Sequence, residues 1–220
     1  MAIVRPFQAV RATRDKVALV SSKSYEDYTP AELSAKLDFN PFTFLHIINP
    51  GYKFHQEVSG QERFRLVHNR FIEFKENNIF TKDEVPTFYI YKTVHGSNTY
   101  CGIIGATSVE DYNSNIIKKH EGTLKRREQL FQEYLNSVGF NAEPVLLTYP
   151  DNPTIQSIID RYQSQRSEYE FTTTDKRLHY VWLITDASDI QIIRTAFAEM
   201  NALYIADGHH RSASSCLLAE

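Results

Sequence analysis

The residues best suited to chemistry are gathered in one pentapeptide late in the chain, Asp-Gly-His-His-Arg at positions 207–211. The apolar run 203–206 precedes it, and a run of small residues from Ser212 follows it. This pattern predicts a strand, a tight turn and a helix opened by Ser212. Unpaired backbone N–H groups and the positive end of the helix dipole favour anions at such a place, phosphate above all. The pentapeptide is therefore the first candidate for a functional site.

Each member of this turn has a chemical use. Gly208 permits a positive φ and a close approach of the backbone to a ligand, and Arg211 can hold a phosphate with paired hydrogen bonds. His209 or His210 could bind a metal, donate to phosphate or transfer a proton near neutral pH. Asp207 could accept a hydroxyl proton or hold a divalent cation. The alternative is a polar turn with a capping Asp and solvent-facing histidines, but a turn does not need so many titratable groups.

A second cluster of charge lies upstream, where residues 118–123 (Lys-Lys-His-Glu-Gly-Thr) lead into the cations of residues 125–127. Thr123 is the expected N-cap of the helix that follows. Cations at a helix N-terminus oppose the dipole unless an anion is bound, so this segment suits a polyanionic ligand such as a nucleotide. Glu121 beside His120 could form a general base with its orienting partner. The alternative is an ordinary solvated, basic helix start.

The elements that must position these segments alternate irregularly. The apolar periodicity and turn signals predict helices over 30–37, 61–77, 123–138 and 154–165 and from Ser188 or Asp189 to Met200. They predict strands at 17–20, 44–48, 143–149, 180–184 and 203–206, and a β-hairpin over 87–107. This mixture indicates an α+β fold of mixed sheets with hairpins and packed helices rather than a doubly wound parallel sheet.

Composition narrows the class of protein. Of the 220 residues, 42% are hydrophobic and 23% are charged, which is ordinary for a globular protein. The net charge of −3 gives no general drive toward nucleic acid, so a nucleic-acid partner is unlikely. No apolar run approaches the ~18 residues of a membrane span, so no membrane partner is expected. The 2 cysteines cannot form a disulfide framework, which favours a reducing, cytoplasmic location. The oligomeric state stays open.

The organisation of the chain indicates a single α+β region over residues 1–220. A weak subdomain boundary is possible near residues 150–153, where two prolines flank a turn. The helix opened by Ser212 has run only about two turns when the sequence stops, whereas helices average roughly 11–12 residues. We therefore expect the sequence to be part of a longer protein.

Several motifs occur in an order shared with one known family: Pro6-Phe7 with Ala9 and Arg11; Asn40-Pro41 with Phe44-Leu45-His46; Phe88-Tyr89-Ile90-Tyr91; residues 118–121 with Thr123; Glu143-Pro144-Val145; and residues 204–211. With these motifs the chain resembles, over essentially its whole length, the bacterial and archaeal family called domain of unknown function 1015. The resemblance implies that the chain is the N-terminal half of a longer protein. One stretch departs from the family pattern, because the Pro-Pro-Tyr-Asp-like loop is replaced by Ser22–Asp27, which has no proline.

The Asp-Gly-His-His-Arg turn is also similar to the phosphate-binding motif of the ParB/sulfiredoxin superfamily, which includes nucleotide-dependent phosphotransferases such as kinases of free serine. This resemblance implies a ParB/sulfiredoxin-like core around the turn, with a nucleotide and a small hydroxylated substrate such as serine as partners. It implies ATP or ADP with magnesium as cofactors, and Asp207 is the candidate metal ligand. The implied catalytic residues are Glu121, His120, Asp207 and His210. The implied phosphate- and nucleotide-binding residues are Gly208, His209, Arg211, Ser212, Lys119 and Thr123.

Two other functions stay open. One is a phosphatase or other hydrolase of a small phosphorylated metabolite, with the same turn holding the substrate phosphate and His209 or His210 as general acid. The other is a non-enzymatic nucleotide-binding or DNA-partitioning module related to ParB, although the chain has no recognisable helix-turn-helix. The phosphotransferase hypothesis makes one geometrical demand: residues 118–123 and 207–211 must be neighbours in space.

Overall fold

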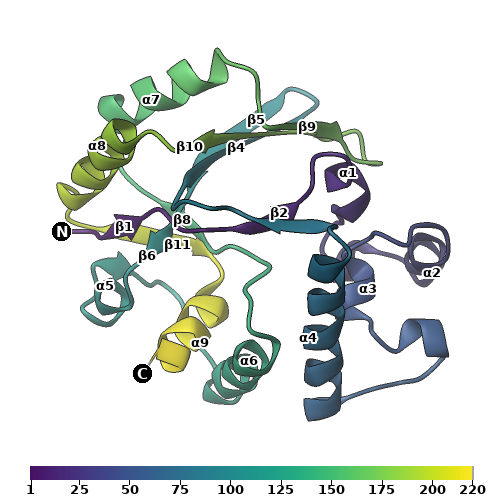
Figure 1. The fold of residues 1–220 in the computed structure, drawn as a ribbon. Coiled ribbons are helices and arrows are strands. Elements are labelled where there is room, and N and C mark those ends of the chain that lie inside the picture. Colours follow the sequence, from purple (N-terminus) through teal and green to yellow (C-terminus); the bar gives the residue numbers. More distant parts are fainter. Residues whose placement is uncertain (220) are drawn as a thin grey trace.

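The computed structural model describes residues 1–219, and its mixed α+β architecture agrees with the irregular order of elements in the sequence (Figure 1). The strands are β1 (Val4–Arg5), β2 (Val10–Ala12), β3 (Phe80–Lys82), β4 (Phe88–His95), β5 (Asn98–Ile104), β6 (Ala106–Thr107), β7 (Ile117–Lys118), β8 (Leu146–Thr148), β9 (Tyr169–Thr172), β10 (Leu178–Ile184) and β11 (Leu203–Asp207). The helices are α1 (Val17–Val20), α2 (Pro30–Phe39), α3 (Leu45–Ile48), α4 (Gly60–Glu76), α5 (Val109–Asn113), α6 (Lys125–Val138), α7 (Pro153–Gln163), α8 (Ala187–Ala198) and α9 (His209–Ala219), with short 3-10 helices η1 (Tyr25–Asp27) and η2 (Tyr52–Phe54).

The largest sheet has 4 strands in the order β5-β4-β10-β9, and all of its pairs are antiparallel. β4 and β5 form the predicted hairpin, in which Gly96 has the positive φ of 61° that tight hairpin turns favour. α7 lies along one face of this sheet (Figure 1). Apolar side chains from both elements share one core cluster, which includes Phe88, Ile90, Trp182, Ile155 and Ile158. Burying each of these large side chains contributes about 1.5–3 kcal/mol.

A smaller sheet carries the candidate site. Its order is β7-β11-β8, so β11 is the central strand, parallel to β7 and antiparallel to β8. Leu203 and Ile205 of β11 are buried in the main core cluster, whereas Tyr204 and Asp207 are exposed. This alternation fixes the strand against the core up to Ile205, and an irregularity of the register between Ile205 and Asp207 leaves the last residue exposed. β11 then leads directly into α9.

The N-terminal helices form a second, separate core cluster on the side of the molecule away from α7 (Figure 1). α4 contributes Phe64, Val67 and Phe74 at helical spacing, as its sequence predicts, and α6 contributes Val138. The two-stranded pair β1-β6 adjoins the main core cluster through Val4, and the pair β2-β3 adjoins the second cluster through Ala12 and Phe80. Within residues 1–219, no helix combines the length and apolarity that crossing a membrane requires. The subdomain boundary near residues 150–153 remains a prediction.

Two apolar runs that were predicted as strands are short helices. Residues 17–20 form α1, and most of residues 44–48 form α3. Such short runs have no periodicity that distinguishes a buried strand from a helical turn. Their backbone groups bond locally instead: the N–H of Val20 donates to the carbonyl of Lys16 at 2.9 Å, and the N–H of Asn49 donates to that of Leu45 at 2.9 Å.

The predicted N-cap of α2 is confirmed. α2 begins at Pro30 after the predicted N-cap Thr29, whose hydroxyl accepts from the N–H of Glu32 at 3.3 Å. The Glu32 carboxylate accepts in return from the Thr29 N–H at 2.9 Å, which completes a capping box. Two other predicted helix starts are wrong: the N-cap of α6 is Leu124 rather than Thr123, and α9 begins at His209 rather than Ser212.

Candidate functional site

The pairing of β7 with β11 brings the two charged segments together. The strands are parallel, with Leu203 opposite Ile117 and Tyr204 opposite Lys118. The residues that follow each strand therefore leave the sheet at the same end. After β7 the chain runs through the loop of residues 119–124 into α6, and after β11 it turns into α9 beside it (Figure 1). The expected proximity of residues 118–123 and 207–211 is confirmed.

His209 is the point of contact between the segments. Its side chain is only 4% exposed, and Nδ1 lies 3.5 Å from Oε2 of Glu121. The ring of His120 packs against it edge-on, with 4.5 Å between ring centroids and an interplanar angle of 86°. Nε2 is buried and has no hydrogen-bond partner among the described residues. A buried polar atom without a partner costs about 1–3 kcal/mol, so it marks a place that a ligand could complete.

His210 has a different task, because it holds the start of α6. The N–H of Leu124 donates to Nε2 of His210 at 3.2 Å. This nitrogen is therefore an acceptor, and the ring proton is on Nδ1. Leu124 has no side chain that can cap α6, so the imidazole ties the helix start to the turn. Thr123, the expected N-cap, donates its hydroxyl to the carboxylate of Glu128 instead.

Arg211 is held by several partners. Nη2 donates to Oδ2 of Asp207 at 2.5 Å, and Nη1 donates to the carbonyl of Pro144 at 2.8 Å. Oε2 of Glu143 lies 3.4 Å from Nη1. Glu143 and Pro144 are thus neighbours of the turn. Their distance from it in the sequence does not predict this contact, although both belong to one of the family motifs.

Gly208 allows the chain to turn between β11 and α9. Its φ of +94° is a conformation that residues with a side chain rarely adopt. A Cβ at this position would lie 3.3 Å from the guanidinium of Arg211. The glycine therefore permits both the backbone conformation and the packing of Arg211 over the turn.

The beginning of α9 presents unpaired donors. In a helix that begins at His209, the N–H groups of His209, His210 and Arg211 have no intrahelical acceptor. The N–H of Ser212 bonds to the carbonyl of Gly208 at 2.9 Å. No acidic residue lies in the first turn of α9 to offset the positive end of its dipole. The positive end of the α9 dipole therefore lies at His209 rather than at Ser212.

The cations of the upstream segment divide into two groups. Lys119 turns toward α5, where its ammonium donates to the carbonyl of Tyr112 at 3.0 Å and lies 3.8 Å from the centre of that ring. The exposed side chains of Lys125, Arg126 and Arg127 form no ion pair with any residue of the part described. These three unpaired cations therefore lie at the start of α6, whose first turn also holds Glu128, beside His210.

The next feature is the arrangement of side chains that could bind a metal ion. Among residues 1–219, no group of three or more His, Cys, Asp or Glu side chains is arranged to hold a metal ion. Asp207, the candidate ligand, is paired with Arg211.

Comparison with known proteins gives one match. The family model described as "Protein of unknown function (DUF1015)" matches residues 4–220. No curated protein matches the chain, and no solved structure does.

Proposed function

The chain belongs to the DUF1015 family of proteins of unknown function, and from this premise we propose that it is a nucleotide-dependent phosphotransferase acting on a small hydroxylated metabolite. One observation carries the proposal. The β7–β11 pairing places Glu121 against the buried His209 at the first turn of α9, where His209 Nε2 lacks a partner. A site for acid–base chemistry and a site for anions therefore coincide.

The turn of residues 207–211 is the proposed phosphate site. The N–H groups of the first turn of α9 are available donors, and Gly208 lets the backbone approach a ligand closely. The Arg211 side chain is 31% exposed, so a phosphate could share its guanidinium with Asp207. Ser212, in the same turn of α9, would add a hydroxyl. The proposed core is ParB/sulfiredoxin-like and consists of β7, β11 and α9.

The start of α6 is the proposed nucleotide side of the site. ATP or ADP would lie toward the unpaired cations of residues 125–127, with His120 and Thr123 at the entrance; Lys119 would have to leave the ring of Tyr112 to take part. Magnesium would be bound by the oxygens of the nucleotide phosphates. The low charge of the chain disfavours nucleic acid as the partner.

The acceptor would be a small metabolite with a hydroxyl group, serine being the simplest. Phosphoryl transfer requires mostly positioning and stabilisation of charge, which donors at a helix start and an adjacent acid–base pair could supply. Glu121 and its histidines would handle the hydroxyl proton. Asp207 would position Arg211 rather than react.

The test is calorimetric binding of ATP, ADP and CTP in the presence of magnesium, followed by ³¹P NMR detection of transfer to serine. We expect one nucleotide to bind, and Arg211→Ala to weaken that binding at least about tenfold, because a charge-assisted contact contributes roughly 1.5–3 kcal/mol. Arg65→Ala is the matched control, since Arg65 is exposed on α4, the helix that contributes Phe64 and Val67 to the second core cluster.

Three outcomes would overturn the proposal. No affinity for any of these nucleotides would remove it altogether. Release of inorganic phosphate from phosphoserine without nucleotide would replace it with a phosphatase. A salt-dependent mobility shift on duplex DNA without transfer activity would favour a binding module.

A further inference from the structure

We propose that His209, rather than Glu121, accepts the proton of the acceptor hydroxyl, and that Glu121 is a positioning residue for the His209 ring. This inference rests on the proposed function and specifies which group of the site contacts the substrate. It also predicts the chemical nature of the missing partner of His209, which must be a hydrogen-bond donor.

The arrangement of Glu121 and His209 determines which nitrogen is available. An ionised carboxylate can only accept hydrogen bonds, so in the neutral form of His209 the ring proton belongs on Nδ1, the nitrogen that lies 3.5 Å from Glu121 Oε2. Nε2 is then left with a lone pair and no donor near it. Phosphate oxygens are acceptors and cannot satisfy a lone pair. A hydroxyl group can, which is the hydrogen bond that general-base catalysis requires.

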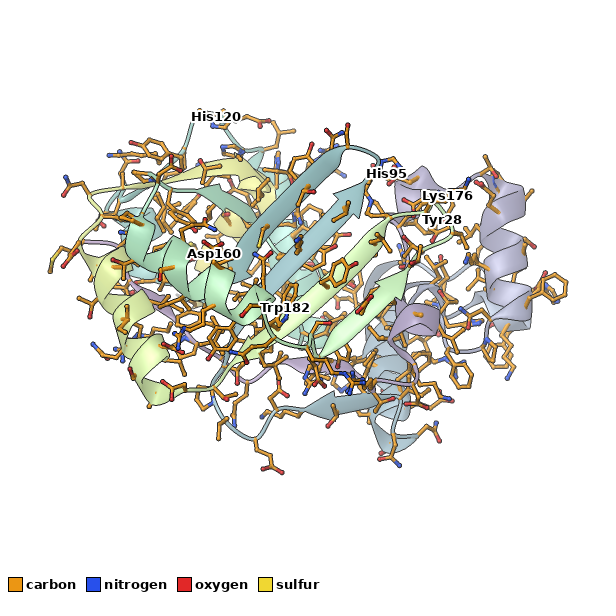
Figure 2. The ribbon with its side chains drawn as sticks, turned by 90° about the horizontal axis from the view of Figure 1, so that it is seen from above. Tyr28, His95, His120, Asp160, Lys176 and Trp182 are labelled. Carbon is orange, nitrogen blue, oxygen red and sulfur yellow. The ribbon has the colours of Figure 1, made fainter. Side chains whose placement is uncertain are left out.

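The other candidates for the base are less suitable. His210 Nε2 already accepts from the N–H of Leu124 at 3.2 Å. His120 is exposed, and Figure 2 shows it on a loop at the edge of the molecule. The Glu121 side chain is 62% exposed, so water would solvate its carboxylate. His209 alone combines burial, an orienting carboxylate and an unpartnered nitrogen.

Access to His209 Nε2 requires a local movement. The His120 ring rests against His209 and belongs to the loop of residues 119–124, which lies outside helices and strands and contains Gly122. Displacing this exposed ring does not require the core cluster beneath β11 to unpack. The acceptor would therefore enter where His120 lies and exclude water from His209 as it binds.

The step balances without any further reactant. The hydroxyl proton passes to Nε2 of His209 while the acceptor oxygen forms a bond to the terminal phosphorus of the nucleotide. The bond from that phosphorus to the bridging oxygen breaks, and its electron pair leaves with the nucleoside phosphate. Glu121 stabilises the resulting imidazolium, which returns its proton to solvent when the products leave.

The experiment separates binding from transfer. We expect His209→Ala to keep its nucleotide dissociation constant within about threefold of the parent protein while transfer to serine falls at least about 100-fold, since general-base catalysis contributes roughly 10²–10⁴. Added imidazole should restore part of the rate, because it can occupy the space of the missing ring. His95→Ala, at the exposed end of β4 next to the hairpin turn, is the matched control.

Glu121 supplies the second arm, because this exposed side chain can be changed with little risk to folding. We expect Glu121→Gln to lower transfer by about tenfold or more and Glu121→Asp to retain part of the parent rate. If Glu121→Gln abolishes transfer while His209→Ala retains it, Glu121 is the base and the inference is wrong. Failure of imidazole to restore any rate would also overturn it. Both results leave the proposed function intact, whereas a parent protein that binds no nucleotide overturns both.

Discussion

Two histidines of this protein differ in the hydrogen-bond partners of their ring nitrogens. On the large sheet, His179 has partners at both ring nitrogens: the hydroxyl of Tyr91 lies 2.8 Å from Nδ1, and that of Thr173 lies 3.0 Å from Nε2. Its ring also stacks on Phe171, with 4.8 Å between centroids. At the start of α9, His209 has a carboxylate near one nitrogen and nothing at the other. A fully partnered histidine stabilises the structure, whereas a histidine with an unused nitrogen has capacity for a ligand.

Burial separates the two histidines only in part, because His209 is buried and His179 is partly buried. His179 follows Lys176, Arg177 and Leu178 in a sequence with no evident motif, and His209 lies in the most conspicuous one. The difference between them is the count of satisfied nitrogens, which requires coordinates. This difference predicts that substitutions of the two histidines change the stability of the protein by different amounts.

The largest expected effect is on stability. His179→Ala removes two hydrogen bonds and a ring stack, so the free energy of unfolding should fall by about 3 kcal/mol. His209→Ala removes buried area but also an unpartnered nitrogen, so its loss should be nearer to about 1 kcal/mol. Urea denaturation of both variants measures the contrast. Equal losses would mean that His209 is as structural as His179.

Substituting the glycines of the two turns, Gly208 and Gly96, should also lower the stability of the protein by different amounts. Gly208→Ala is expected to cost about 2 kcal/mol, because a positive φ is strained and the new Cβ would meet Arg211. Gly96→Ala, in the hairpin of the large sheet, should cost only about 1 kcal/mol, because its φ is also positive but nothing lies within 4 Å of the new atom. Thermal unfolding followed by circular dichroism compares them. If the Gly208 variant is no less stable than the Gly96 variant, the Arg211 side chain can move away from the new Cβ at no cost in stability.

Acid should destabilise the sheet through His179. Burial lowers the pKa of His179 below its ordinary value, with Arg177 acting in the same direction and Asp175 against it. The unfolded chain therefore binds the proton first as the pH falls below about 6.5, and stability is lost from there down to the folded pKa. His46 contributes in the same direction, because burial also lowers its pKa.

The measurement is the free energy of unfolding between pH 7 and pH 5, in the parent protein and in His179→Gln. The variant should show a shallower decline, because one of the two histidines with a lowered pKa is gone. A decline as steep as that of the parent would mean that His179 has no part in the acid sensitivity.

The smallest effect is expected at His210. Replacing it with Ala leaves the N–H of Leu124 without its acceptor, but this N–H lies at an exposed position and can bond to water. The loss should be about 0.5–1 kcal/mol, typical of a helix-capping contact. Urea denaturation can detect it beside Thr29→Ala, a capping change of similar size at α2. A loss as large as that of His179→Ala would place His210 with the structural histidines.

The elements that could be predicted from sequence are those with local causes. The N-cap Thr29 and Pro30 at the first helical position predict α2. The helical spacing of Phe64, Val67 and Phe74 predicts α4. The hairpin of β4 and β5 was predicted from two strand-like runs on either side of a loop that contains Gly96, and it is present. The prediction of a strand at residues 17–20 was wrong, because a short apolar run is compatible with either a strand or a helix.

The contacts within the candidate site depend on tertiary structure. β7 has only 2 residues, too few to show periodicity, yet its pairing with β11 brings Glu121 to His209. The sequence led us to pair Glu121 with its neighbour His120, and the structure instead places His120 as a cover on His209. The residue types of the site could be predicted, but their pairing depends on a parallel contact that no local rule describes.

The β7–β11 contact also has a kinetic meaning. Leu124 and His210, which meet at the site, are 86 residues apart in the sequence. Closing so long a segment costs conformational entropy before any contact offsets it, and non-local pairings of this kind slow folding. During synthesis the α6 side of the site leaves the ribosome long before its counterpart, so the cations of residues 125–127 are exposed without the turn they adjoin. The site is therefore expected to form only after residues 207–211 have been synthesised.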